Sequence, residues 1–233
     1  MTSDKQVCCA VSGELLSSIE APFFAHRKDM KNPEDYRILL TRDELAFGTR
    51  ALAAQLNQDY EGQEVVILPV LNGAPWFAVD LSRELNFPVT FHFISASSYG
   101  VNRHSCGEVT TDLSNLVNKD FRNKKILIVD ELFDSGKTIS VLKQNLISQF
   151  EIPAEHVKSV TLMSTSKPTS QDPADYCFFV KFTNMWLLGY GLDDKGLYRN
   201  FPHVLVYYPP DKERAELDQR FLNSRRRILD CFH

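Results

Sequence analysis

The sequence predicts an α/β protein in which a parallel sheet is flanked by helices. Between residues 37 and 163, apolar runs typical of strands alternate with segments of helical spacing, and this alternation favours parallel strands joined by helical crossovers. The run Ile126–Val129 contains only aliphatic residues, most of them β-branched. Such a run is typical of a strand that is buried on both faces in the middle of a parallel sheet.

Length and composition favour one soluble globular domain. The chain has 233 residues, of which 43% are hydrophobic and 24% charged, so it can bury a substantial core. The net charge is −4 and no apolar run approaches the length of a membrane span; we therefore expect neither a nucleic acid nor a membrane as a partner. The five irregularly spaced cysteines fit neither a disulfide framework nor a zinc site, which favours a reduced compartment.

The first part of the chain predicts an extension, a strand and a long helix. Residues 1–36 have weak periodicity and include two prolines, so we expect an irregular, partly packed extension. Arg37–Leu40 is typical of a short strand. Thr41 and Glu44 have the spacing of a capping box, which predicts a helix from there to about Tyr60.

The next segment predicts a strand, a turn, a helix and another strand. Val65–Val70 is typical of a buried strand, residues 71–74 form the turn, and Pro75 suits the first turn of a helix that ends near Asn86. Val89–Ser95 is predicted to be one strand. Ala96–Asn118 is long, polar and without periodicity, and loops of this length are usually functional or mobile.

The later segments predict a core sheet with a smaller cap. A helix over Ile139–Phe150 and a strand over Val157–Met163 continue the alternation, which breaks after residue 168. Later strands and a C-terminal helix are expected at Tyr176–Phe182, Trp186–Gly189 and 211–230, the helix with Leu217, Phe221 and Ile228 facing inward. We therefore predict a single domain, with a core over residues 37–166 and a cap formed by residues 1–36 and 167–233.

The residues that follow the central strand are the most informative in the chain. Asp130 and Glu131 stand at its carboxyl end, the end where open α/β sheets bind ligands. The turn after them consists of Asp134, Ser135, Gly136, Lys137 and Thr138. It opens a helix whose free amides and positive dipole end suit a phosphate group. An acid pair beside a phosphate cradle predicts a site for a ribose 5-phosphate and a hard cation.

Two other interpretations fit parts of this stretch: a nucleotide-binding P-loop and a plain helix start. Gly136-Lys137-Thr138 also matches the end of the nucleotide-binding P-loop, but that motif needs a glycine five residues before Gly136, where this chain has Glu131. A carboxylate there would repel phosphate, so we reject the P-loop and with it a P-loop-type kinase. A plain helix start, with Asp134 or Ser135 as the N-cap, remains compatible with the residues.

The whole stretch Lys124–Thr138 resembles the phosphoribosyl pyrophosphate signature of type I phosphoribosyltransferases: two acids, two apolar residues, then Asp-Thr/Ser-Gly-Lys-Thr. Further motifs follow the family's order between residues 37 and 210. Together they resemble the 6-oxopurine branch, the hypoxanthine-guanine(-xanthine) phosphoribosyltransferases, and Ser105-Cys106-Gly107 is similar to the trypanosomatid kind. The resemblance implies the type I phosphoribosyltransferase fold, in which a small hood subdomain covers a parallel sheet.

The resemblance also assigns roles to the signature residues. Residues 134–138 would hold the 5-phosphate, and Asp130 and Glu131 the ribose hydroxyls and Mg²⁺, with Asp193 as a third contact to the metal. Asp134 would be the general base or acid at purine N7. The order Asp-Glu reverses the commoner Glu-Asp, which leaves open how the pair divides its work.

The pyrophosphate loop is assigned in the same way to Leu71, Asn72 and Gly73, with Arg199 reaching the diphosphate. In the family the peptide bond after the leucine is often cis. Asn72 stands where the family usually has a lysine. With that cation missing, diphosphate binding would depend more on the backbone, the metal and Arg199.

The purine site is assigned to a later segment, together with a covering loop. The implied contacts are Leu132, Lys167, Trp186, Leu187 and Asp193, with Ser98 and Tyr99 in the mobile loop. Lys167 would donate to the 6-oxo group and Trp186 would stack on the base. The neighbouring Asn184 and Met185 depart from the usual polar residues, which leaves base specificity open. As an alternative, Trp186 and Leu187 are plain core residues of a strand.

These assignments predict a purine-salvage transferase. It would join hypoxanthine or guanine, and weakly xanthine, to phosphoribosyl pyrophosphate with Mg²⁺, as a homodimer or homotetramer. The alternative is a regulatory protein that binds phosphoribosyl pyrophosphate without turnover. The N-terminus has no signal-peptide pattern and the C-terminus is not Ser-Lys-Leu, so we expect the cytoplasm, with the glycosome as the alternative.

Overall fold

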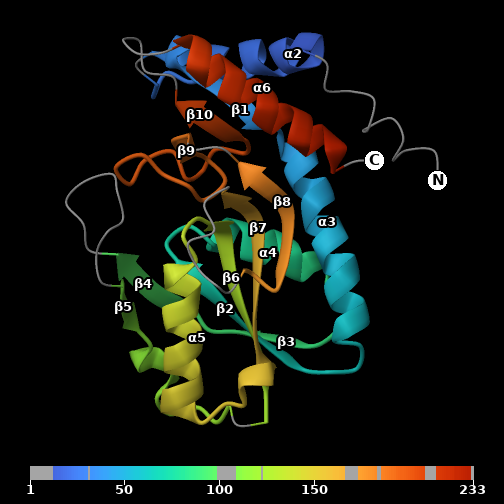
Figure 1. Cartoon of the computed structure of the whole chain (residues 1–233), viewed down its shortest axis with the longest axis vertical. Helices are drawn as coiled ribbons and strands as arrows, with labels where there is room; N and C mark the ends of the chain where they lie inside the picture. The colour runs from blue at the N-terminus through green and yellow to red at the C-terminus, as the bar shows by residue number, and fades with distance from the viewer. Residues whose placement is uncertain are drawn as a thin grey trace.

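The computed structural model describes residues 13–30, 32–98, 109–121, 123–165, 173–182, 185–207 and 214–231. The core is a seven-stranded sheet (Figure 1). Its spatial order is β5 (Val109–Asp112), β4 (Ile94–Ser98), β2 (Val65–Leu71), β6 (Lys125–Phe133), β7 (Val157–Thr165) and β8 (Tyr176–Phe182), with β3 (Val89–Phe91) also paired to β2. The strands are parallel except for the antiparallel pair β4–β5. The predicted α/β fold is therefore confirmed.

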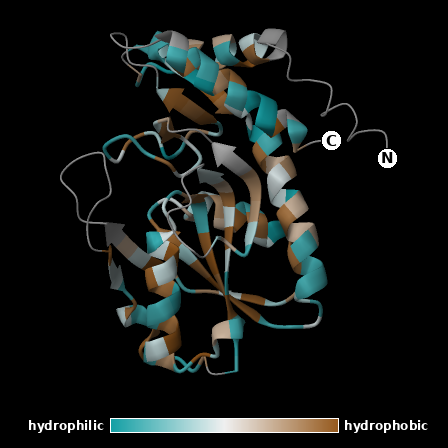
Figure 2. Cartoon of the chain, in the orientation of Figure 1, coloured by the Kyte–Doolittle hydropathy of each residue, from teal (hydrophilic) through white to brown (hydrophobic). Residues whose placement is uncertain are grey.

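Helices cover both faces of this sheet because the central strands are apolar on both sides. Leu127 and Val129 of β6 belong to one core cluster, together with residues of α3 (Arg42–Asp59) and α4 (Pro75–Glu84). Ile126 and Ile128 belong to a second cluster, with residues of α5 (Lys137–Phe150). Figure 2 shows the hydrophobic colour along these central strands. This alternation is what a continuous apolar run produces in a parallel sheet.

A smaller subdomain lies beyond the carboxyl ends of the core strands (Figure 1). Its antiparallel sheet has the order β1–β10–β9. We call it the hood; its elements are β1 (Tyr36–Leu40), β9 (Leu187–Leu188), β10 (Val204–Tyr207), α2 (Gly13–Ala25) and α6 (Arg214–Asp230). Short 3₁₀ turns lie at Pro33–Asp35, Ser114–Leu116 and Ala154–His156.

A buried ion pair joins the hood to the core. Arg225 of α6 donates to both carboxylate oxygens of Glu44, at 3.0 and 2.9 Å, and to the carbonyl of Leu39 at 2.6 Å. Glu44 also accepts from the backbone amide of Thr41, while the Thr41 hydroxyl accepts from the amide of Glu44. The predicted capping box is thus present, and the arginine fixes α6 on the end of α3.

The pairing on one side of β2 is interrupted at a proline. β2 pairs with β3 through Ile67 and with β4 from Val70 onward. Pro69 lies between these pairings and has no backbone N–H to donate. The prediction of one strand over Val89–Ser95 is therefore wrong: the segment forms two strands separated at residues 92–93.

The long segment Ala96–Asn118 was expected to lack regular structure. Its ends are structured, because β4 runs to Ser98 and pairs with β5, which a 3₁₀ turn follows. Residues 99–108, including Tyr99, lie outside the described part of the chain.

Two expectations for the hood also need correction. Residues 13–25 are helical rather than irregular. Leu16, Ile19 and Phe23 have helical spacing and pack on the core. The sequence did not predict this helix because the apolar pattern is short and includes Pro22. The strand assigned to the core at 37–40 instead pairs with β10, a strand that the sequence did not predict.

The C-terminal helix agrees with its prediction, since Phe221 and Ile228 are buried and Leu217 packs against the same cluster. Within the described residues, no helix combines the length and apolar character needed to cross a membrane.

Candidate active site

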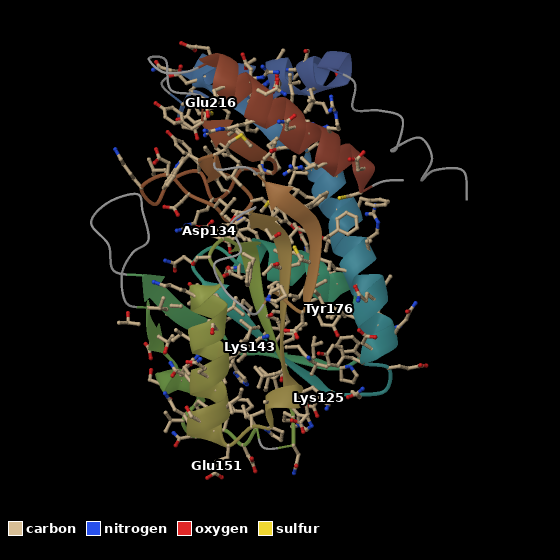
Figure 3. The ribbon with its side chains drawn as sticks, viewed as in Figure 1. Lys125, Asp134, Lys143, Glu151, Tyr176 and Glu216 are labelled. Atoms are coloured by element: carbon tan, nitrogen blue, oxygen red, sulfur yellow. The ribbon has the colours of Figure 1, made fainter. Side chains whose placement is uncertain are left out.

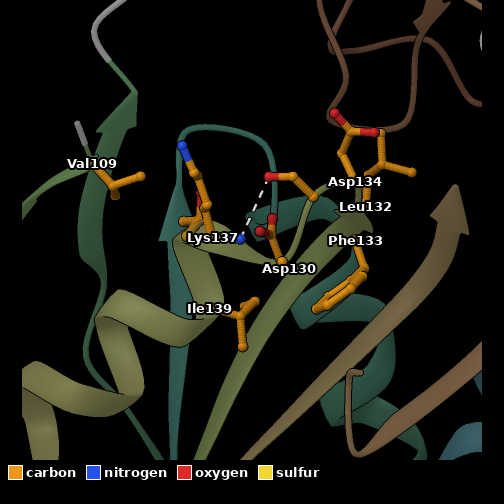
Figure 4. A pocket seen from close by; sticks show the side chains of 10 residues that line it. Val109, Asp130, Leu132, Phe133, Asp134, Lys137 and Ile139 are labelled. Carbon is orange, nitrogen blue, oxygen red and sulfur yellow. Dashed lines mark hydrogen bonds between the residues drawn. The ribbon is translucent and has the colours of Figure 1, made fainter. Parts of the chain in front are cut away.

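The site forms where β6 ends below the hood, because parallel strands bring their carboxyl ends to one edge. A cavity of about 170 Å³ lies there, lined by Val109, Asp130 and residues 132–139. Figure 4 shows Asp130, Asp134 and Lys137 around it, and in Figure 3 Asp134 lies between the core and the hood. The structure thus brings the signature residues of the predicted phosphate cradle to one cavity.

The turn at residues 134–138 begins α5 without a side-chain cap. Gly136 is the N-cap residue, at φ 77°, and no side chain caps the helix. The amide of Lys137 donates to the Ser135 hydroxyl over 3.4 Å, a long contact that Figure 4 shows as a dashed line. The alternative of a plain helix capped by Asp134 or Ser135 is therefore not observed. The amide of Lys137, at the start of the helix, is thus held only by this long contact, which suits the binding of an anion.

Asp130 and Glu131 lie within β6 itself, which runs to Phe133, four residues beyond the predicted end at Val129. Asp130 is half-buried and Glu131 is buried. Burial, followed by the charge of Glu131, raises the pKa of Asp130 well above its usual value. Burial likewise raises the pKa of Glu131. Oε2 of Glu131 has no hydrogen-bond partner within the described structure. An acid pair held in this way is suited to a cation or to hydroxyl groups.

The turn after β2 packs directly on Glu131. The Leu71–Asn72 peptide bond is cis, the geometry that the resemblance implied. A β-carbon on Gly73 would lie 1.8 Å from Oε1 of Glu131, so any larger residue there would displace the Glu131 carboxylate. Asn72 is exposed.

A loop from the hood meets this turn by backbone contact. Gly191 has φ 98°, and a β-carbon on it would lie 2.2 Å from the carbonyl oxygen of Gly73. Arg199 donates to the Gly191 carbonyl at 2.5 Å and pairs with Asp193 at 2.6 Å. The predicted diphosphate residue Arg199 therefore lies beside the predicted loop, but its guanidinium is engaged within the protein.

Asp193 is occupied in the same way. One carboxylate oxygen pairs with Arg199 and the other accepts from the amide of Gly196 at 2.6 Å. Across the described residues, no three acidic, histidine or cysteine side chains converge as metal ligands. Asp193 still lies within electrostatic reach of Glu131 and contributes to its raised pKa.

The structure describes the predicted purine residues only in part. Trp186 is 37% exposed, Leu187 is buried, and Leu132 is half-buried against the core. The carbonyl of Trp186 accepts from the amide of Tyr207. Lys167 and the side chain of Ser98 lie outside the described residues.

Sequence reasoning missed three residues at this edge. Thr165 contacts Asp134. Val109 lines the cavity. Tyr190, with φ 50°, donates to Asp80 at 2.9 Å and so ties the hood loop to α4. Thr165 ends the strand next to β6, so the rule that pointed to Asp130 could have pointed to it as well.

The comparisons with known proteins identify the family. Residues 35–195 match the family described as Phosphoribosyl transferase domain. The chain belongs to this family.

Individual relatives agree with this assignment. A hypoxanthine-guanine-xanthine phosphoribosyltransferase from Tritrichomonas foetus is 34% identical over 72% of this chain and 89% of its own length. The bifunctional protein TilS/HprT of Listeria innocua is 35% identical over 74% of this chain, but the match spans only 26% of that protein. The crystal structure of a Staphylococcus aureus hypoxanthine phosphoribosyltransferase has a TM-score of 0.67 at 28% identity, covering 79% of this chain and 97% of that one. The trypanosomatid affinity stays a prediction.

Proposed function

We propose that this protein is a purine-salvage phosphoribosyltransferase that joins hypoxanthine or guanine to phosphoribosyl pyrophosphate, giving the nucleoside 5-monophosphate and pyrophosphate. The observation that carries the proposal is the cavity at the start of α5, where the turn 134–138 and Asp130 line one space. A phosphate on the amides of that turn would direct its ribose toward the acid pair. The names of the relatives support the same substrates.

The acid pair binds the ribose and, with it, Mg²⁺. The partnerless Oε2 of Glu131 and the raised pKa values of both carboxyls fit a cationic ligand, which would hold both groups ionised. Asp130 and Glu131 would hold the metal, with Asp193 nearby, and the metal would neutralise the departing diphosphate.

The diphosphate is assigned to the turn 71–73 and Arg199. The turn offers backbone groups and no cationic side chain, because Asn72 stands in the usual place of lysine. Arg199 must exchange its contact with Asp193 for the diphosphate. That exchange is feasible because the two side chains keep 23% and 30% of their surface in water.

The base is handled from the hood side of the cavity. Asp134 takes or gives the proton at N7 and stands at the rim with its side chain exposed. Trp186 and Leu132 enclose the two faces of the ring, and the backbone of Leu187 meets its edge. Lys167 donates to the 6-oxo group and so selects oxopurines over adenine.

Xanthine is a second candidate base. Its 2-oxo group needs a donor where the amino group of guanine needs an acceptor. Asn184 and Met185 depart from the polar residues that are usual there in the family, and one relative is named for xanthine use. A regulatory protein without turnover is not supported, because these relatives are named as transferases.

The test is a base panel with purified protein. Protein, phosphoribosyl pyrophosphate and Mg²⁺ are mixed with hypoxanthine, guanine, xanthine or adenine, and nucleotide formation is followed by absorbance. We expect turnover of hypoxanthine and guanine, weak turnover of xanthine and none of adenine. Lys167→Ala should raise KM for both good substrates. Efficient use of adenine would refute the role of Lys167, and absence of all turnover would refute the proposed function.

We also propose a homodimer or homotetramer in the cytosol, with the glycosome as the alternative. Support for self-association comes from Trp76 and Val79, apolar residues of α4 that are each 37% exposed. Light scattering on the purified protein measures the mass, and a monomer at micromolar concentration would contradict the assembly. An N-terminal fluorescent tag tests the location, since a punctate signal would favour the glycosome.

A further inference from the structure

The register of two neighbouring strands sets a polar contact at the rim of the site. β6 and β7 are parallel, and their last registered pair is Phe133 with Ser164. The next residues along the chain are Asp134, directly after the end of β6, and Thr165, the last residue of β7. Because parallel strands end at the same edge of a sheet, the side chain of Thr165 lies beside the residue assigned to proton transfer.

The contact is direct. Oγ1 of Thr165 lies 2.9 Å from Oδ1 of Asp134 and 3.1 Å from its carbonyl oxygen, so the hydroxyl donates to either acceptor. One donor therefore links the carboxylate of Asp134 to a strand end. This contact uses Oδ1, so Oδ2 can face a substrate proton.

Threonine suits this task better than a less restricted side chain. Its branched β-carbon limits χ1 in a strand, so the hydroxyl itself points in a fixed direction. Asp134 is exposed, and an exposed carboxylate samples several rotamers that binding must restrict. For efficient proton transfer, the carboxylate must lie within hydrogen-bond distance of the purine nitrogen, and only then does its pKa matter.

We infer that Thr165 is a positioning residue for the transfer reaction, which acts by orienting the carboxylate of Asp134 toward the purine. This inference rests on the proposed function. In the sequence, Thr165 stands two residues before Lys167, the lysine assigned to the 6-oxo group.

The first experiment compares Thr165→Val with Thr165→Ser and with Thr161→Val as a matched control. Thr161 lies on the same strand, and its hydroxyl has no hydrogen-bond partner within the described structure, so its removal should leave kcat unchanged. Thr165→Val should lower kcat about 10-fold, the factor that one charge-assisted hydrogen bond provides. KM for phosphoribosyl pyrophosphate should change less than about twofold. Thr165→Ser should restore most of kcat, since it keeps the donor.

The second experiment repeats the substitution in an Asp134→Ala background, as a double-mutant cycle. With the carboxylate gone, Thr165→Val should have no further effect on kcat. An equal loss in both backgrounds would assign Thr165 a merely structural role and overturn the inference. So would wild-type kcat in Thr165→Val. Should the valine variant not fold, as judged by thermal unfolding, Thr165→Ala serves in both arms.

The outcomes separate the two claims. If the wild-type protein forms no nucleotide, the proposed function fails and the inference fails with it. If the wild type is active and Asp134→Ala is impaired while Thr165→Val is not, only the inference fails.

Discussion

Two arginine–carboxylate pairs of this protein differ in what surrounds them. The pair Arg225–Glu44, between the hood and α3, is 6% and 2% exposed, and Arg225 also donates to the carbonyl of Leu39. The pair Arg199–Asp193, at the rim of the site, is 23% and 30% exposed. The same chemistry gives a permanent joint where water is excluded and an exchangeable contact where water can replace a partner.

The buried carboxylates of the two regions also differ in their hydrogen-bond partners. At the hood joint, Glu44 accepts from both Arg225 and the start of α3. At the site, the buried Glu131 keeps an oxygen without a partner among the described groups, and its pKa is raised. We therefore expect substitutions at the joint to change stability and substitutions at the edge of the site to change catalysis.

The largest expected effect is catalytic. Asp134→Asn should lower kcat about 100- to 10,000-fold, the usual contribution of a general acid or base, and should leave the unfolding free energy nearly unchanged because the side chain is exposed. Steady-state kinetics and urea denaturation measure the two quantities. Asp43→Asn, also at an exposed position, is the control. A large loss of stability in Asp134→Asn would contradict the expectation that substitutions at the site change catalysis rather than stability.

The next effect falls on stability. Arg225→Met should destabilise the protein by about 3–5 kcal/mol, because it leaves the buried Glu44 without its partner. kcat of the folded protein should not change. The neighbouring Arg226 is exposed, so Arg226→Met controls for the loss of one charge on α6. Urea denaturation curves, recorded below the unfolding temperature, measure the unfolding free energy of both variants. A loss of kcat in Arg225→Met without a loss of stability would contradict the assignment of this pair to stability.

A third effect concerns pH, in protein free of metal and substrates. Because the folded pKa values of Asp130 and Glu131 are raised by burial, the folded state holds more protons than the unfolded state above the ordinary carboxyl pKa. The unfolding free energy should therefore fall as pH rises through the raised pKa values. Glu131→Gln should flatten this dependence and stabilise the protein at neutral pH, while weakening substrate binding. The unfolding free energy of the wild type and of Glu131→Gln is measured by denaturation at several pH values. The same pH dependence in both proteins would show that the buried Glu131 carboxyl does not cause it.

The smallest effect concerns the contact between the hood loop and α4. Tyr190→Phe removes the hydroxyl that donates to Asp80, a loss of about 0.5–1.5 kcal/mol in stability. Since Tyr190 adjoins Gly191, which contacts the turn 71–73, KM for phosphoribosyl pyrophosphate should rise as well. Tyr36→Phe, in the hood sheet, is a control of equal chemistry. Unchanged KM in Tyr190→Phe would mean that the loop is held by its backbone alone.

Sequence reasoning succeeded where the information is local. The apolar run of β6, the capping box at Thr41 and the turn 134–138 depend on residues that are close in sequence, so spacing alone predicted them. The family assignment followed from the same stretch, and residues 35–195 confirm it.

It failed where the deciding contact is distant. Glu44 and Arg225 are 181 residues apart, and Thr165 reaches Asp134 only through the register of two strands. No feature of the sequence around Gly191 indicates that its backbone lies against Gly73. No local pattern encodes such contacts, because they depend on how elements pack after they form.

The interruption of pairing at Pro69 has a consequence for how the sheet opens. β4 and β5 share an antiparallel ladder of their own, and among the described residues only Val70 and Leu71 pair it with β2. The hairpin can therefore separate from the sheet at a smaller free energy than global unfolding, leaving β2, β6 and β7 intact. Amide protons of residues 94–98 should exchange with deuterium long before those of residues 126–129.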